Sequence, residues 1–343
     1  MIVIGDISCP NPVLAKCFQK DIIKSGIFEK QAILCNLEGL IRNDEPYSDS
    51  KLFNCEEVLN SFDPERTVFS IANNHTYDYP ELIESTVQIL EKKGYGCVGR
   101  YTKGLIEPCI LESGNTTYAI FAHCWKMYTR TNKNTINNEK IVDCAYEAFF
   151  DEVIRYTVQH REQRVICYFH WNYDMEILPF PMHRTLSKDL IDHGVFAVIG
   201  NHSHVTQGGE LYKGAPIIYG LGNFYMPSKL YFDGKLTFPE ISKKAMAFEI
   251  DDNTGEFKCH WFVTDGADYT VNKISSESFI EGKIINSESP YRNMNDKDYK
   301  VYFKKNRKKG FLVPVFDRYK GSRFALKEKI GIARIKLIKL IKD

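Results

Sequence analysis

Short apolar runs alternate with helix-forming segments through the first two thirds of this 343-residue chain. The runs are rich in Val, Ile, Tyr and Phe, which predicts buried strands. The predicted strands are residues 2–5, 32–35, 67–72, 117–123, 164–171 and 195–200. The predicted helices between them are residues 12–25, 80–93, 143–160 and 183–193. Strands and helices in alternation predict a layered α/β fold.

The pattern changes after residue 200. Apolar stretches at 215–224, 244–251 and 257–265 are separated by Gly, Pro, Asn and Asp. This pattern predicts strands joined by turns, and we expect them to form an antiparallel second sheet packed on the first. From about residue 267 the sequence is polar and lacks a clear period until about residue 311. The expected organisation is a folded domain (1–265), a polar connecting segment (266–322) and a terminal helix (323–343).

Composition excludes several classes of protein. The chain is 43% hydrophobic and 26% charged, as in ordinary globular proteins, and no stretch approaches the roughly 20 apolar residues of a membrane span. Its first residues lack the features of a secretory signal, so we expect a cytoplasmic protein. The ten cysteines form no CxxC pair, which gives no support to a zinc knuckle or a thioredoxin-like site.

Charge is distributed unevenly along the chain. Residues 300–343 contain 15 Lys and Arg against three acids, whereas the rest contains 30 bases and 41 acids. The acidic body argues against nucleic acid as the main partner, and the basic tail favours an anionic surface.

The last 21 residues have helical character. On a helical wheel one apolar stripe, flanked by Lys and Arg, contains Leu326, Ile330, Ala333, Leu337, Leu340 and Ile341. Residues Ile332, Ile335 and Ile338 fall off this stripe. Two interpretations stay open: a basic helix that lies on anionic lipid at the inner membrane face, or a helix docked on the body with its basic face in solvent.

Polar residues stand where the predicted strands end. The carboxyl ends of neighbouring strands in an α/β sheet converge on one crevice, so we expect these side chains to meet. They are Asp6, Glu38, Asn74, His75, His170, His202 and His204. Carboxylate, amide and imidazole groups together are typical of sites for divalent cations, and two ions can share a bridging oxygen.

Taken singly, most of these residues have a structural explanation. An Asp can cap a turn, an Asn can hold a turn, and a histidine at the end of an apolar strand is commonly hydrogen-bonded in a core. The His202 and His204 pair is the strongest single indication of metal binding. Other candidates for the rim of the crevice are His123, Asp174 and Glu176.

Read together, the segments resemble the CapA-type family of bacterial capsule-synthesis proteins, also called poly-γ-glutamate synthesis proteins, which is related to calcineurin-like metallophosphoesterases. The resemblance covers residues 1 to about 265. It is carried in order by GD at 5–6, NLEG at 36–39, ANNHTYDY at 72–79, FHW at 169–171 and the stretch 190–224, which ends in YGLGNF.

The resemblance implies a four-layer α/β/β/α sandwich and a site for two divalent ions, Mn, Fe or Zn. The implied metal ligands are Asp6, Glu38, Asn74, His170, His202 and His204. His75 would be the catalytic histidine that protonates a leaving oxygen or stabilises phosphoryl charge, and Asp78 would orient it. The chain departs from the usual pattern at four positions, which are Ser8, Glu38, Asn172 and Asn201.

Two functions are therefore expected for this chain. The first is a metal-dependent phosphoesterase-like enzyme that acts on an anionic precursor or polymer of the cell envelope. The alternative, favoured by Ser8 in place of the usual first-motif histidine, is an accessory protein that binds such a polymer without turning it over.

Overall fold

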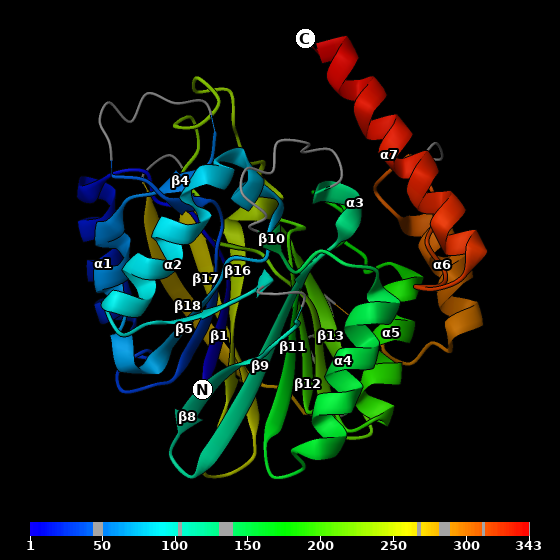
Figure 1. Cartoon of the computed structure of the whole chain (residues 1–343), viewed down its shortest axis with the longest axis horizontal. Coiled ribbons are helices and arrows are strands. Elements are labelled where there is room, and N and C mark those ends of the chain that lie inside the picture. Colours follow the sequence, from blue (N-terminus) through cyan, green and yellow to red (C-terminus); the bar gives the residue numbers. More distant parts are fainter. Residues whose placement is uncertain are drawn as a thin grey trace.

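The computed structural model describes residues 1–43, 51–101, 105–129, 140–265, 269–280, 289–310 and 313–342, without the side chains of 101, 140 and 338–342. Two β-sheets occupy the middle of the molecule and helices cover their outer sides (Figure 1). The mixed α/β fold expected from the sequence is therefore confirmed.

The first sheet has the order β18-β17-β16-β1-β2-β5-β6, and β15 also pairs with β1. Strands β1, β2, β5, β6 and β15 are parallel, whereas β16, β17 and β18 are antiparallel additions. The bounds are β1 Ile2–Ile7, β2 Ile33–Leu37, β5 Thr67–Ser70, β6 Gly96–Val98, β15 Asn223–Tyr225, β16 Lys244–Ile250, β17 Phe257–Asp265 and β18 Thr270–Ser278.

The second sheet has the order β13-β14-β12-β11-β9-β8, parallel in its middle and antiparallel at both edges. Its strands are β8 Cys109–Ser113, β9 Thr116–Cys124, β11 Arg164–His170, β12 Ala197–Asn201, β13 Thr206–Tyr212 and β14 Ala215–Leu221. Two small pairs complete the strands: β3 Leu40–Ile41 with β4 Phe53–Asn54, and β7 Arg100–Tyr101 with β10 Lys140–Ile141.

The expectation that the late strands form a sheet of their own is wrong. Strands β13 and β14 extend the sheet of β9, β11 and β12, while β16, β17 and β18 extend the sheet of β1. Turn residues and apolar runs identify strands locally, but pairing partners are chosen by which apolar faces meet in three dimensions.

Most helices begin and end where the sequence indicates. Helix α1 keeps its predicted bounds, since the Asn11 side chain accepts a hydrogen bond from Leu14 N and Gly26 ends the helix with φ 71°. The other helices are α2 Ile83–Lys92, α3 Lys126–Thr129, α4 Tyr146–Gln159, α5 Pro181–Asp192, α6 Asp296–Asn306 and α7 Ser322–Lys342. Short 3₁₀ turns cover Glu56–Ser61, Pro64–Arg66, Asn74–Asp78, Pro80–Leu82 and Glu240–Lys243.

Successive side chains of a strand point to opposite faces of the sheet, and this alternation separates three apolar cores. Val3 and Leu34 face the second sheet, where they share a core with Ile166, whereas Ile2 and Ile4 face the opposite way and pack with Phe18 of α1. On the far side of the second sheet, a third core joins that sheet to α4, α5, α6 and the start of α7. The period of two thus gives each central strand two buried faces.

The two sheets touch closely beside the end of β1. A Cβ atom on Gly5 would lie 2.1 Å from the carbonyl oxygen of Gly222, so this approach requires glycine. Gly222 itself has φ 77° and turns the chain from β14 in the second sheet to β15 in the first. The crossing places Asp6, which follows Gly5, at the junction of both sheets.

The segment 266–322, expected to be a polar connection, contains strand β18 and helix α6. Helix α6 is anchored by Tyr299, whose ring lies 4.4 Å from the guanidinium carbon of Arg184. Arg184 in turn donates two hydrogen bonds to Glu210, from Nε at 2.7 Å and from Nη2 at 2.9 Å, and both side chains are buried. The sequence did not indicate helix α6, because few of its residues are apolar. The contact of Tyr299 with Arg184 and the buried ion pair of Arg184 and Glu210 hold the helix in place.

Replacing Glu210 with Gln should destabilise the protein by about 3–5 kcal/mol, since the Arg184 charge would stay buried without a partner. Urea unfolding measures the loss. The matched control is Glu152→Gln in the exposed pair with Arg155, which should change stability by less than about 1 kcal/mol. Equal effects of the two substitutions would contradict the assigned role.

His123, a candidate for the rim of the site, lies instead in the outer core of the second sheet. Its ring packs against Tyr146 and Phe149 at centroid distances of 4.9 and 4.8 Å, and burial lowers its pKa to about 4. The folded pKa is below the unfolded value of about 6.5, so the neutral ring stabilises the fold above pH 6.5 and this stability is lost as pH falls toward 4.

Between pH 7.5 and pH 5 the wild type should therefore lose about 2 kcal/mol more stability than His123→Gln. Urea unfolding at the two pH values tests this difference. The half-exposed His160 provides the control, because His160→Gln should keep the wild-type pH dependence. Parallel pH profiles for wild type and His123→Gln would refute the assignment.

Candidate metal centre

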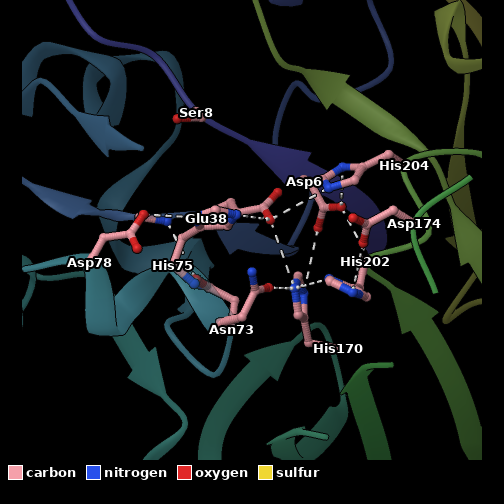
Figure 2. Close-up of polar contacts among 12 residues, drawn as sticks. Asp6, Ser8, Glu38, Asn73, His75, Asp78, His170, Asp174, His202 and His204 are labelled. Carbon is pink, nitrogen blue, oxygen red and sulfur yellow. Dashed lines mark hydrogen bonds and ion pairs between the residues drawn. The ribbon is translucent and has the colours of Figure 1, made fainter. Parts of the chain in front are cut away.

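The polar side chains expected to meet at the strand ends do so: Figure 2 shows Asp6, Glu38, His75, His170, His202 and His204 together, and Asn74 Oδ1 lies 2.7 Å from His170 Nε2. Asp6 lies in β1, Glu38 follows β2, and Asn74 and His75 begin the 3₁₀ turn after β5. His170 ends β11, and His202 and His204 follow β12. The site therefore draws on the carboxyl ends of parallel strands from both sheets.

Unusual backbone conformations shape the two loops from the second sheet. His202 and His204 have φ of 81° and 55°, a left-handed conformation that costs a non-glycine residue energy and is common at functional sites. Asn172 also has a positive φ of 75°. Asn tolerates this conformation better than most residues, so the turn after His170 can form without a glycine.

Glu38 is the centre of the cluster. Its side chain is fully buried, and neither carboxylate oxygen has a hydrogen-bond partner among the described residues. Three imidazoles surround its Oε1: Nε2 of His75 and of His170 at 3.8 Å, and Nε2 of His204 at 3.9 Å. A buried carboxylate that has no hydrogen-bond donor among the described residues would be stabilised by a cation. At these distances the imidazoles lie near the Glu38 carboxylate without forming hydrogen bonds to it.

One subset of these groups is close enough to share a single ion. Glu38, His202 and His204 are all buried, and each offers a ligand atom within 4.8 Å of the others. An oxygen and two imidazole nitrogens suit borderline divalent cations. The residues present thus fit one metal ion, whereas the sequence predicted two.

The remaining predicted ligands lie beside this group and bond to one another. His170 Nε2 is 2.7 Å from Asn74 Oδ1 and 2.8 Å from His202 Nδ1. Asp6 lies with Oδ2 3.6 Å from His204 Nδ1 and with Oδ1 3.9 Å from His170 Nδ1. Asp6, His170 and Asn74 are therefore neighbours of the Glu38 group, on the side of β11.

Burial controls the charge of this cluster. It raises the pKa of Glu38 well above its ordinary range, and the charge of Asp6 raises it further. Burial also raises the pKa of Asp6, although His204 opposes this, and it lowers the pKa of His170 well below 6.5 together with the charge of His202. Without a cation the site thus favours neutral forms, and a bound cation would stabilise the carboxylates.

His75 and Asp78 form a second, more open pair. His75 Nδ1 lies 2.7 Å from Asp78 Oδ2, and both side chains are 18% exposed. The Asn73 side chain accepts hydrogen bonds from the backbone of His75 and Thr76 and thereby fixes this turn. Because Asp78 contacts Nδ1 of His75, Nε2 of the same ring points toward Glu38. An anion bound beside Glu38 could therefore contact Nε2.

Several residues that contact the site were not among the predicted site residues. Asn36 donates to Asp6 at 2.8 Å, Asn223 lies 2.7 Å from His204 Nδ1, and the Tyr128 ring lies 4.2 Å from that of His202. Asn36 and Asn223 belong to the NLEG and GLGNF motifs, which could have indicated them. Tyr128 has no sequence signal, because tertiary packing of α3 brings it to the site.

Three further positions, Ser8, Asp174 and Glu176, differ in their relation to the site. Ser8 points away from the cluster (Figure 2) and is hydrogen-bonded to Phe53 O and Tyr231. Asp174, a predicted rim residue, has Oδ1 3.0 Å from His202 Nε2. Glu176, the other rim candidate, is buried and accepts hydrogen bonds from the backbone of Lys308 and Lys309, so its role is structural.

A buried Glu and His cluster at strand ends of a mixed α/β fold defines a candidate metal-binding protein. The chain belongs to the family described as bacterial capsule synthesis protein PGA_cap, which matches residues 15–228. That match includes every predicted site residue except Asp6.

Two curated relatives share a short stretch with this chain. It is 37% identical over 60 residues to the capsule biosynthesis protein CapA of Bacillus anthracis and 35% identical over 60 residues to the PGA biosynthesis protein CapA of Bacillus subtilis strain 168. Each stretch covers 18% of this chain, and 15% and 16% of those proteins, respectively.

Solved structures with a similar arrangement include phosphoesterases. A putative 5'-nucleotidase from Staphylococcus aureus is 11% identical, with a TM-score of 0.43 and coverage of 81% of this chain and 54% of that one. The calcineurin-like phosphoesterase YfkN from Bacillus subtilis is 12% identical, with a TM-score of 0.37 and coverage of 88% and 98%.

Replacing Glu38 with Gln should stabilise the metal-free protein at pH 7.5 by about 1–3 kcal/mol, because the substitution removes a buried charge without donors. The folded pKa of Glu38 is raised, so its destabilising effect is absent below its unfolded pKa and grows as pH rises. Urea unfolding in chelator measures the gain, which should shrink toward pH 4.5, and elemental analysis should show that the variant loses metal.

The equally buried Glu176 provides the control. Its oxygens accept backbone hydrogen bonds, so Glu176→Gln should destabilise the metal-free protein while leaving metal content unchanged. A Glu38→Gln variant that is less stable in chelator, or that retains full metal content, would contradict the assignment of Glu38 as the centre of a cation site.

Proposed function

We propose that this chain is a metal-dependent phosphoesterase-like enzyme of capsule or related surface-polymer synthesis. The observation that carries the proposal is the buried carboxylate of Glu38. It has no hydrogen-bond donor among the described residues, and three imidazoles surround it. The family supports the connection to capsule synthesis.

The proposed cofactor is a pair of divalent ions, Mn, Fe or Zn. Glu38, His202 and His204 would hold one, and Asp6, Asn74 and His170, with Glu38 shared, would hold the other. When bound, such ions lower the pKa of a shared water and neutralise charge on a phosphoryl group. His202 and His204 keep their orientation through contacts with Asp174 and Asn223.

His75 is the proposed catalytic histidine. Asp78 holds its Nδ1 and thereby presents Nε2 to the cluster, where a protonated ring would donate its proton to a leaving oxygen. Because both side chains are partly exposed, this pair lies at the entrance rather than in the core. The anionic substrate would therefore approach from the side of His75.

The finer features of the fold follow from the same proposal. We assign residues 1–265, together with β18 at the edge of the first sheet, to the four-layer sandwich of the metallophosphoesterases, with the rest of the C-terminal segment as an addition. The proposed substrate is an anionic precursor or polymer of the envelope, handled at the cytoplasmic side of the membrane.

A second function, a polymer-binding accessory protein, is favoured by Ser8. This residue stands where related phosphoesterases have a histidine, and its hydroxyl is occupied by Tyr231 and Phe53 O. Under this alternative the same cluster would hold an ion that captures an anionic polymer without hydrolysis.

Turnover of aryl phosphate mono- and diesters in the presence of Mn²⁺ tests the proposal. We expect turnover to fall by about 10²- to 10⁴-fold in His75→Ala, the usual contribution of a general acid, with metal content unchanged. The control is His160→Ala, a half-exposed histidine at the end of α4, which should retain wild-type activity.

The outcomes separate the two functions. Bound metal with no turnover of any ester would favour the accessory protein. Turnover that survives His75→Ala unchanged would overturn the catalytic assignment, and protein purified without chelator that holds no divalent ion would overturn both.

A further inference from the structure

Helix α7 docks on the body through residues other than its predicted apolar stripe. Phe324, Glu328 and Gly331 are buried, and Ile335 packs partly buried against the outer core. At 100° per residue these positions lie about 180° from the stripe. The docked face is therefore the side of the helix opposite to the apolar stripe.

The contacts of the docked face are specific. Trp125 Nε1 donates a hydrogen bond of 3.2 Å to Glu328 Oε1. A Cβ atom on Gly331 would lie 2.7 Å from the sulfur of Met127 and 3.5 Å from the Tyr173 hydroxyl, so the helix packs closely on α3. These contacts fix the rotation of α7 about its own axis.

The stripe itself faces solvent as a result. Leu326, Ile330 and Leu337 are 59%, 50% and 58% exposed, and Ala333 between them is also exposed. Leu340 and Ile341 of the predicted stripe lie outside the described side chains. The exposed part spans about 16 Å along the helix. Apolar side chains in a continuous row on a surface indicate an interaction site.

Charge on α7 indicates what covers this row. The helix contains seven bases and one acid, and the acid is Glu328, which is buried against the body. Lys329 and Lys336 border the row on one side, and Arg323 and Arg334 border it on the other. A surface that pairs an apolar row with positive borders complements anionic headgroups above acyl chains.

We infer that the exposed face of α7, formed by Leu326, Ile330, Ala333 and Leu337 with its four bordering bases, binds the surface of an anionic lipid bilayer. The helix would lie along the interface. Among the described residues no helix combines the length and apolarity that crossing a bilayer requires.

The arrangement connects this surface to the candidate metal centre. The docked face of α7 packs on α3, and Tyr128 of α3 lies with its ring 4.2 Å from that of His202. Figure 1 shows α7 along the outer side of the body, with α3 beside it. Helix α7 therefore packs on α3, the helix that places Tyr128 against His202.

Binding to vesicles tests the inference without any need for turnover. The full chain should cosediment with phosphatidylglycerol vesicles at low salt and much less with phosphatidylcholine vesicles, and added salt should weaken the binding. Lys329→Gln with Lys336→Gln should lower the partition coefficient by about 30-fold, since each base contributes about 1 kcal/mol near an anionic surface.

The apolar row has a matched control on α1. Leu326→Gln with Leu337→Gln should reduce binding at least tenfold, whereas Val13→Gln with Ile23→Gln should leave it unchanged. Val13 and Ile23 are 71% and 72% exposed and also lie among lysines, but they form no continuous row. Circular dichroism and tryptophan fluorescence should show that all three double variants remain folded.

Three outcomes would overturn the inference. They are absence of binding to phosphatidylglycerol at low salt, equal losses for the α7 and α1 variants, and a wild-type dimer that the Leu326 and Leu337 substitutions dissociate. The last would show that a second copy of the chain covers the row. Loss of phosphoesterase activity in His75→Ala bears on none of these results.

Discussion

The buried carboxylate of Glu38 is the constraint around which this molecule is organised. Removing a carboxylate charge from water costs several kcal/mol when no donor compensates it, and Glu38 has none among the described residues, where β1, β2 and β5 meet β11 and β12. The surrounding imidazoles place nitrogen atoms near Glu38 Oε1 without bonding to it. A bound cation would stabilise the charged form of this carboxylate, and this buried Glu and His group could hold one.

The junction of the two sheets makes this concentration of charge feasible. At Gly5 and Gly222 the backbones approach more closely than any side chain would allow, and Gly222 carries the chain from one sheet to the other. The carboxyl ends of parallel strands from two separate sheets therefore meet at a single buried cluster. The positive φ values of His202 and His204 occur in this cluster, where packing from both sheets can hold them.

The C-terminal segment adds two helices to this frame. Helix α6 is held by the buried Arg184 and Glu210 pair and by Tyr299, and the segment after it is held by Glu176. Helix α7 packs through Phe324, Glu328 and Gly331, which leaves an apolar row with basic borders in solvent. Helix α7 thus has apolar side chains on two opposite sides, and the described part of the body covers one of these sides.

Sequence alone determined the central strands of both sheets, most helices and the gathering of polar residues at strand ends, since these follow from local periodicity and from the direction of parallel strands. It predicted β11 with His170 at its end, the bounds of α1, and the resemblance that the family match confirms. Which sheet each late strand joins, the packing of Tyr128 on His202, the burial of His123 away from the site and the docked face of α7 were decided by tertiary structure. These features depend on contacts between residues far apart in the chain, and a local pattern cannot report which of two apolar faces will find a partner.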